Sequence, residues 1–142
     1  HLTEKETGRG FYVFNTHWDH KSQPSRDGAA KLIAERIAAR EKKGDPVVLM
    51  GDFNAAEENT AILALKHGPL VFEDTYRLLH PDESMVRTFH GFEGGEARGG
   101  KIDHVFVLKD TATVEAAEIV RYNEDSRYLS DHYPVRAVVR FK

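Results

Sequence analysis

The order of apolar and polar positions divides the chain into short segments with two different periodicities. Residues 11–17 are mostly β-branched or aromatic and follow a glycine-flanked turn, which is typical of a strand. From Ser25 the apolar residues recur every three or four positions. This spacing predicts an amphipathic helix of about five turns that Ser25 caps and that residues 42–44 close. Its core-facing stripe consists of Ala29, Ala30, Ile33 and Ile37.

A continuous apolar run at residues 47–50 predicts a strand that is buried on both faces. A shorter helix is expected at about 59–67, and glycine pairs within 93–101 predict a loop. Strand, helix and strand in this order suggest a layered arrangement of helices and sheet, with a later half that is mostly β. Three further strands are predicted at 102–108, 114–120 and 135–141.

Composition narrows the class of protein. The chain has 142 residues, of which 40% are hydrophobic and 30% charged, as in one soluble globular domain. No apolar run approaches the roughly 20 residues of a membrane helix. The formal charge of −3 gives no overall attraction to nucleic acid or anionic lipid, and the absence of cysteine excludes disulfides and thiol chemistry. Because the chain begins at His1 without a methionine, we expect it to be a piece of a longer protein.

Clusters of His, Asp and Asn stand at the ends of the predicted strands, which is where α/β proteins place their sites. Carboxylates, amides and imidazoles without thiols suit Mg²⁺ or Mn²⁺ and a phosphate ester better than a structural zinc site. The chemistry indicated is hydrolysis. The clusters are residues 15–20, 51–54, 101–104 and 130–134.

Each cluster alone has a simpler interpretation. Asp52 and Asn54 are compatible with an Asx turn, and residues 131–134 with an ordinary loop before a proline. His17 and His20 are compatible with two surface residues or with a zinc site that lacks a visible third ligand. It is the joint occurrence of the clusters that favours a functional site.

Four motifs follow one another in a fixed order along the chain: Asn15-Thr16-His17, Gly51-Asp52-Phe53-Asn54, Lys101-Ile102-Asp103-His104 and Ser130-Asp131-His132. They resemble those of the endonuclease/exonuclease/phosphatase superfamily, whose members have the deoxyribonuclease-I-like fold. A further stretch, residues 88–92, resembles bacterial members, and the resemblance covers nearly the whole chain. It implies an α+β portion of a four-layer α/β/β/α sandwich, with a mixed, mainly antiparallel sheet and helices on one face.

The resemblance implies five catalytic residues. His17 would contact the scissile phosphate and stabilise the developing charge. Asp52 would position or deprotonate the attacking water, or protonate the leaving group, and Asn54 would orient the phosphate. Asp103 would hold His132 in its working orientation and raise its basicity.

The resemblance also implies a Mg²⁺ or Mn²⁺ site at Asp131, with Asp52 and His132 as further ligands. Other residues are weaker candidates: Asp19, Asp74 and Arg77 for the substrate groove, and Arg98 and Lys101 for phosphate contacts. His104 occupies a position that is more often aromatic in the family. The residues expected to bind substrate are His17, Asn54, His20, Arg26 and His90.

The family domain has roughly 250 residues, so residues 1–142 are expected to be a single domain that forms its C-terminal portion. The N-terminal half, with a catalytic Asn and a metal-binding Glu, would then be absent. The inner face of the sheet would be covered by that half or by a dimer partner. The fragment alone would be incomplete for catalysis.

The function predicted is divalent-metal-dependent phosphoesterase activity on a phosphomonoester or phosphodiester through activated water. Nucleic acid is a possible substrate that the charge does not indicate. The alternative is a non-catalytic binding module with the same fold, followed by a histidine-based zinc protein. Bacterial relatives are often exported, which leaves the cytoplasm and export both open.

Overall fold

The computed structural model describes residues 1–84, 86–95 and 100–142, and it contains two sheets. The larger, five-stranded sheet has the order β1-β2-β3-β5-β4, and β6 and β7 form a separate hairpin. Only β2 and β3 pair in parallel among the described strands, so the expected mixed, mainly antiparallel sheet is confirmed. The strands are β1 (Leu2–Thr3), β2 (Gly10–His17), β3 (Val47–Asp52), β4 (Phe72–Asp74), β5 (Asp103–Leu108), β6 (Ala112–Ile119) and β7 (Val135–Phe141).

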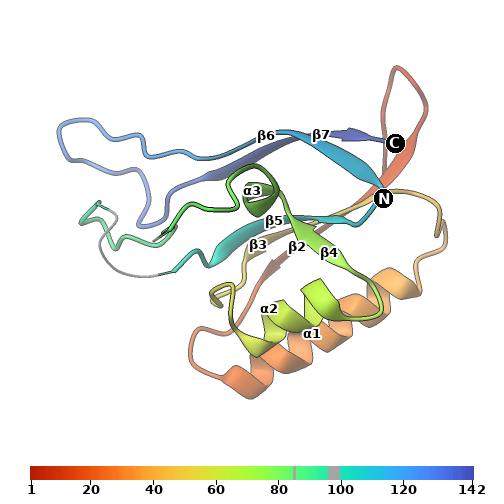
Figure 1. The fold of residues 1–142 in the computed structure, drawn as a ribbon, viewed down its shortest axis with the longest axis horizontal. Helices are drawn as coiled ribbons and strands as arrows, with labels where there is room; N and C mark the ends of the chain where they lie inside the picture. Colours follow the sequence, from red (N-terminus) through yellow and green to blue (C-terminus); the bar gives the residue numbers. More distant parts are fainter. Residues whose placement is uncertain (85, 96–99) are drawn as a thin grey trace.

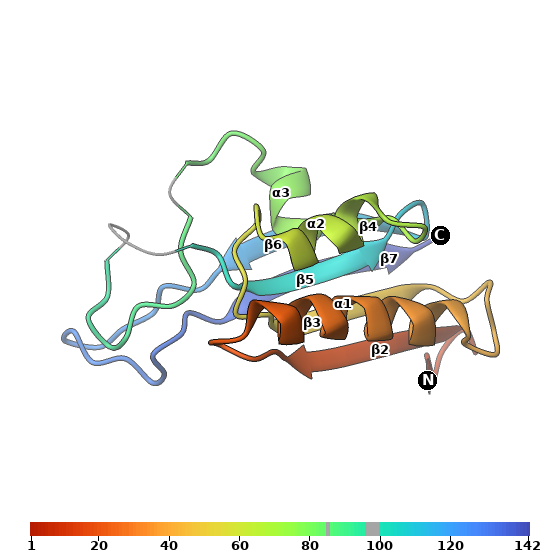
Figure 2. The same cartoon turned by 90° about the horizontal axis from the view of Figure 1, so that it is seen from below.

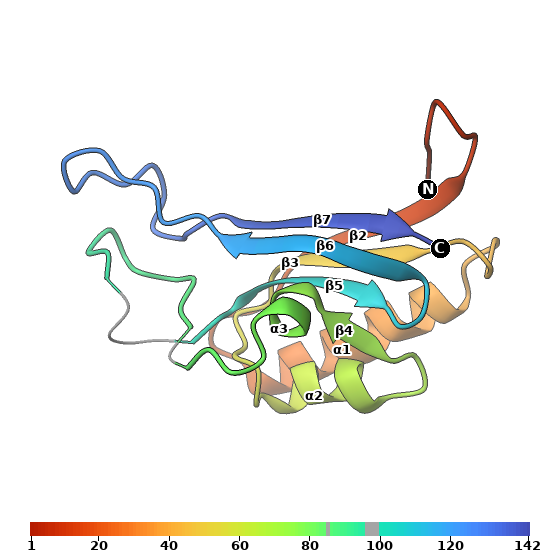
Figure 3. The same cartoon turned by 45° about the horizontal axis from the view of Figure 1, so that its top comes forward.

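Helices α1 (Gln23–Ala38) and α2 (Thr60–His67) lie side by side on one face of the larger sheet. The β6–β7 hairpin lies on the opposite side, and α3 (Thr75–Leu79) packs beside it (Figures 1 and 3). The two longer helices therefore cover one face, as the resemblance implied, and the short helix α3 lies on the other side. No helix in the described ranges is long and apolar enough to cross a membrane.

Helix α1 differs from its prediction at both ends. Its N-cap is Ser22, whose side chain accepts the N–H of Ser25 at 3.2 Å, so Ser25 is a helical residue rather than the cap. The helix ends at Ala38, before the predicted closure at 42–44. Just after it, the buried guanidinium of Arg40 donates to a carbonyl of the last turn at 2.9 Å. This side chain helps turn the chain back towards β3.

Three short elements were not predicted. Strands β1 and β4 contain only two and three residues, which is too short for a periodicity to appear. Strand β4 is defined by its pairing with β5, a contact between distant parts of the chain. Helix α3 has five residues and begins at Thr75, and the carboxylate of Asp74 caps it. Residues 96–99 of the predicted glycine-rich loop lie outside the described residues.

The main core lies between the sheet and helices α1 and α2. The predicted apolar stripe of α1 faces it, with Ala30 and Ile37 fully buried and its other members packed against them. A smaller core joins α3 and β6 to the segment before β7. The buried residues of the main core are Trp18, Ala30, Ile37, Val47, Leu49, Phe53, Ala55, Ala61, Ile62, Leu65, Phe72 and Phe106.

The topology fixes where the polar motifs meet. Because β5 runs antiparallel to β3, the start of β5 lies beside the ends of β2 and β3. Figure 2 shows these strand ends at one end of the molecule and both chain termini at the other. Motifs separated by more than 80 residues are thereby brought to one edge.

Candidate functional site

Three polar side chains lie in one row across neighbouring strands. The register pairs His17 of β2 with Asp52 of β3, and Asp52 with Asp103 of β5. Paired residues on adjacent strands project from the same face of a sheet. Leu49 and Phe106 stand three positions from the row on β3 and β5 and belong to the core beneath the helices. The row therefore projects from the face opposite α1 and α2.

Phe53 anchors the Gly-Asp-Phe-Asn motif in the core. Its side chain is fully buried and packs edge-on against Trp18 and Phe106, at ring-centroid distances of 4.7 and 5.4 Å. Burial of such a ring stabilises the fold by about 1.5–3 kcal/mol. Asp52 and Asn54 flank this anchor on either side. The buried ring of Phe53 thus fixes the positions of Asp52 and Asn54 at the end of β3.

Gly51 is required by close contact between β2 and β3. Its φ is +141°, and a Cβ at this position would lie 1.8 Å from the carbonyl oxygen of Thr16. No side chain fits in that space. The glycine of the motif therefore allows β3 to approach β2 one residue before Asp52.

Asn54 has a left-handed backbone conformation, with φ of +47°, which asparagine tolerates better than most residues. Its N–H donates to Asp52 Oδ1 at 2.8 Å, which is the Asx turn considered from the sequence. Its side-chain amide donates to the carbonyl oxygen of Trp18 at 2.9 Å and lies 3.4 Å from Asp52 Oδ2. The Asx turn thus forms part of the candidate site. Trp18, to which the sequence assigned no role, orients Asn54 through its carbonyl oxygen.

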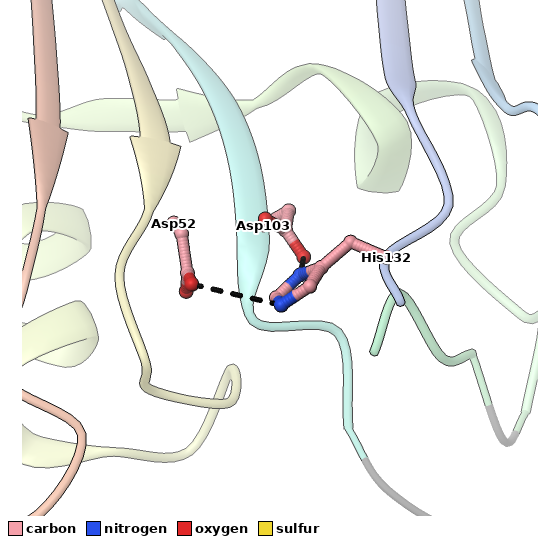
Figure 4. Close-up of side chains that lie close together, drawn as sticks. All are labelled: Asp52, Asp103 and His132. Atoms are coloured by element: carbon pink, nitrogen blue, oxygen red, sulfur yellow. Dashed lines mark hydrogen bonds and ion pairs between the residues drawn. The ribbon is translucent and has the colours of Figure 1, made fainter. Parts of the chain in front are cut away.

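Asp103 and His132 form a hydrogen-bonded pair. His132 comes from the segment before β7 and lies beside Asp103 at the start of β5, as Figure 4 shows. Its Nδ1 lies 2.8 Å from Asp103 Oδ2, and because a carboxylate only accepts, Nδ1 carries the proton. Its Nε2 lies 3.9 Å from Asp52 Oδ2. The pairing predicted between Asp103 and His132 is present.

His17 stands at the open side of the row. Its Nε2 lies 3.3 Å from Asp52 Oδ2, and its side chain is 73% exposed, whereas that of Asp52 is 17% exposed. Asp52 is therefore flanked by one exposed imidazole and one that is held by a carboxylate. Of the three side chains in the row, that of His17 is the most accessible to solvent.

These side chains line one open cleft with a volume of about 480 Å³. Three carboxylates and three imidazoles line it, and within the described part of the chain no Lys or Arg does. Without a cation, the carboxylates would repel a phosphate ester. The lining consists of His17, His20, Asp52, Asn54, Asp103, Asp131 and His132.

Two residues expected to bind substrate lie away from the lining of this cleft. The guanidinium of Arg26 donates to the carbonyl oxygen of Asp19 at 2.9 Å and to Gln23 Oε1 at 2.7 Å, so it braces the turn before α1. Asp19 accepts two backbone N–H groups of the same turn, which hold the pKa of its carboxyl below the usual value. His90 is buried between two tyrosines, beside a small pocket that also touches His132.

Lys101 does not reach the cleft, so the idea that it contacts phosphate is wrong. Its ammonium is buried against Asp74 and lies 2.6 Å from His104 Nδ1. Burial raises the pKa of Asp74, but hydrogen bonds and charge from His104 and Lys101 outweigh it and hold that pKa well below the usual value. Arg77 is also structural, because it forms a two-pronged ion pair with Glu57 at 2.7 Å. Arg98 lies outside the described residues.

Asp52, Asp103 and His132 offer ligand atoms that lie within 4.8 Å of one another. Mg²⁺ is commonly held by one or two carboxylates together with water, so this oxygen-rich set fits part of a Mg²⁺ shell. His132 and Asp103 are already bonded to each other, which leaves Asp52 as the better ligand. Among the described residues, Asp131 lies on the same cleft but outside this tight group.

Comparison with known proteins identifies the family and the fold. Residues 1–132 match the sequence model of the Endonuclease/Exonuclease/phosphatase family. The chain belongs to this family. No curated protein matches the chain in sequence.

Solved structures of the family have the same fold. A family protein from Bacteroides vulgatus is 28% identical, with a TM-score of 0.84 over 99% of this chain and 53% of its own. The mannosyl-6-phosphatase Bt3783 of Bacteroides thetaiotaomicron is 28% identical, with a TM-score of 0.80 over 98% of this chain and 54% of its own. The human Nocturnin catalytic domain, at 20% identity and a TM-score of 0.73, shares the fold over 99% of this chain and 50% of its own. The chain thus spans about half the length of each.

Proposed function

We propose that the protein is a divalent-metal-dependent phosphoesterase in which water attacks phosphorus within the cleft. The observation that carries the proposal is the row of His17, Asp52 and Asp103, completed by His132. It supplies a held imidazole, a carboxylate beside it and an exposed imidazole towards solvent. These are the groups that hydrolysis of a phosphate ester needs.

The spacing of two acceptors supports water activation. Asp52 Oδ2 and His132 Nε2 are 3.9 Å apart, too far for a direct hydrogen bond, yet one water can lie about 2.8 Å from both. That water donates one O–H to each acceptor and keeps a lone pair for phosphorus. As the new P–O bond forms, His132 takes one water proton, the P–O bond to the leaving group breaks, and the departing oxygen takes a proton from solvent to leave as the alcohol. Asp103 stabilises the resulting imidazolium.

The phosphate has partners on the open side. His17 donates a hydrogen bond to one phosphoryl oxygen. The side-chain amide of Asn54 gives up its long 3.4 Å contact with Asp52 and donates to a second phosphoryl oxygen. The carboxylates of Asp52 and Asp131 provide ligands for Mg²⁺ or Mn²⁺. A bound cation would neutralise charge on the phosphate, for which the described lining offers no Lys or Arg.

The chain supplies the C-terminal portion of the catalytic domain in this proposal. It spans about half of its structural neighbours, so further ligands and substrate contacts come from residues outside it. An open gap of about 790 Å³ between the β1–β2 edge and the end of β7 is where the remainder of the domain would pack. Phe11, Val139 and Phe141 line this gap with apolar surface.

The substrate we favour is a phosphomonoester of a small hydroxyl compound. The 28%-identical neighbour named a mannosyl-6-phosphatase is consistent with this class. A nucleic-acid backbone is the second candidate, and it would need basic residues from outside this chain, because Lys and Arg do not line the described cleft. The non-catalytic alternative remains the same fold used as a binding module.

Two substitutions in the full gene product test the proposal. Asp52→Asn and His132→Ala are each expected to lower kcat/KM on phosphate esters by about 100-fold or more, with melting temperatures within a few degrees of wild type. Glu41→Gln, which changes an exposed carboxylate between α1 and β3, outside the lining of the cleft, is the control. Turnover near the wild-type rate in either variant would remove the residue from the mechanism.

A further inference from the structure

Residues 88–91 run between the two segments that carry Asp103 and His132. This stretch, called the strap here, precedes the glycine-rich segment and contacts both sides of the catalytic pair. It lies within residues 88–92, the stretch that resembles bacterial members of the family, and only His90 in it had an expected role. Its first residue, Thr88, is completely buried although it is polar.

Thr88 uses its side chain to hold the start of β5. Its Oγ1 accepts the backbone N–H of Ile102 at 3.0 Å and that of Asp103 at 3.1 Å. The carbonyl oxygen of Ile102 accepts the N–H of Phe53 at 2.9 Å, so this segment is fixed on both sides. The hydroxyl of Thr88 thus holds two successive N–H groups of the backbone that presents Asp103.

The main chain of the same residue holds the other side. The carbonyl oxygen of Thr88 accepts the N–H of Tyr133 at 2.7 Å, one residue after His132. Further along the strap, the N–H groups of His90 and Gly91 donate to the carbonyl oxygen of Asp131, at 2.8 and 3.1 Å. His132 is therefore bracketed by strap contacts at both of its neighbours.

Phe89 completes the contact with a side chain. Its ring meets the imidazole of His132 at 62°, with centroids 5.1 Å apart. The two residues also form an isolated β-bridge. An aromatic edge against an imidazole restricts rotation of the ring.

We infer that Thr88 is a positioning residue of the site, which sets the alignment of Asp103 with His132 through its hydroxyl and its carbonyl. Asp103 and His132 are 29 residues apart in sequence and belong to different segments. Thr88 bonds directly to the backbone of both segments. The inference rests on the proposed function, since it names what orients that function's proton acceptor.

The decisive comparison is Thr88→Val against Thr88→Ser in the full gene product. Valine keeps the shape and removes the acceptor of two buried N–H groups, whereas serine keeps the acceptor. We expect Thr88→Val to lower kcat by about 10- to 100-fold with KM nearly unchanged, because a small misplacement of a catalytic group costs about that much. Thr88→Ser should stay within about 3-fold of wild type. Thr113→Val, at an exposed position of β6, is the matched control.

A double substitution distinguishes a positioning role of Thr88 from a general loss of structure at the site. In an Asp103→Asn background, Thr88→Val should lower kcat by less than about 3-fold further, because the pair that it aligns is already broken. A loss of the same size in both backgrounds would overturn the inference. So would equal activity of the valine and serine variants.

Hydrogen exchange gives a readout that does not depend on activity. The amides of Ile102 and Asp103 should lose protection in Thr88→Val and keep it in Thr88→Ser. Unchanged protection would refute the inference even if the protein hydrolyses no phosphate ester, and lost protection without any turnover would refute only the proposed function. If the valine variant does not fold, Thr88→Cys, a weaker acceptor, should show the same changes in smaller measure.

Discussion

Removal of the carboxylate that holds His132 tests the proposed proton transfer. Asp103 Oδ2 accepts the Nδ1 proton of His132 at 2.8 Å, which leaves Nε2 without a proton and able to take one from water. In Asp103→Asn, the amide NH₂ can donate to Nδ1 instead. The imidazole then carries its proton on Nε2, facing Asp52, and cannot act as a base.

The size of the loss follows from the role. General-base catalysis contributes about 10²- to 10⁴-fold to a rate, which corresponds to about 3–5 kcal/mol of transition-state stabilisation. Asparagine is nearly isosteric with aspartate and the Asp103 side chain is 18% exposed, so the packing is preserved. We therefore expect kcat/KM of Asp103→Asn to fall by about 10²- to 10⁴-fold with little change in stability.

The assay is release of phosphate or alcohol by the full gene product at pH 7, with thermal unfolding measured in parallel. Asp110→Asn is a matched control, because Asp110 is exposed at the turn that follows the other end of β5 and asparagine tolerates its positive φ of 65°. The control should keep wild-type activity. If Asp103→Asn retained more than about a tenth of the wild-type kcat/KM, the tautomer argument would be refuted.

Two further predictions concern stability. Gly51→Ala should destabilise the protein by about 3 kcal/mol or more, because the added Cβ meets the Thr16 carbonyl, whereas Gly28→Ala in α1 meets nothing and should stabilise by about 0.5–1 kcal/mol. Thermal or urea unfolding of both variants checks this, and equal stabilities would contradict it. The lowered pKa of Asp74 stabilises the fold at neutral pH, and this contribution should disappear as pH falls below about 4. Asp74→Asn keeps the oxygen that caps α3 but removes the charge that pairs with Lys101. It should therefore lower the free energy of unfolding by about 3–5 kcal/mol at pH 7 and weaken the loss of stability below about pH 4. An unchanged dependence of stability on pH would count against the buried ion pair.

Much of the site could be predicted because its motifs combine local geometry with chemistry. A buried strand that runs directly into Gly51-Asp52-Phe53-Asn54 places the polar residues at a sheet edge whatever the rest of the fold does. The pairing of Asp103 with His132 came from resemblance to the family, since no local pattern links residues 29 positions apart. The structure supplies the register that puts both beside Asp52.

The unpredicted parts depend on contacts between distant segments. Lys101 follows a glycine pair in sequence, and lysine is usually a surface residue. It is nevertheless buried, because Asp74, 27 residues earlier, lies beside it and pairs with its charge. Strand β4 exists through its pairing with β5. Thr88 showed no chemical pattern of its own, because its role appears only when the segments on both sides are in place. In each case the missing information was a partner far along the chain.

The central claim is metal-dependent hydrolysis of a phosphate ester. Its most direct test measures product release by the full gene product from a panel of sugar phosphates, other phosphomonoesters, phosphodiesters and DNA, with Mg²⁺ or Mn²⁺ and with EDTA, beside the 142-residue chain alone. The proposal predicts turnover of at least one ester by the full product, abolished by EDTA and restored by Mg²⁺ or Mn²⁺, and little or none by the chain alone. Absence of turnover on every substrate, or turnover that EDTA leaves unchanged, would contradict it.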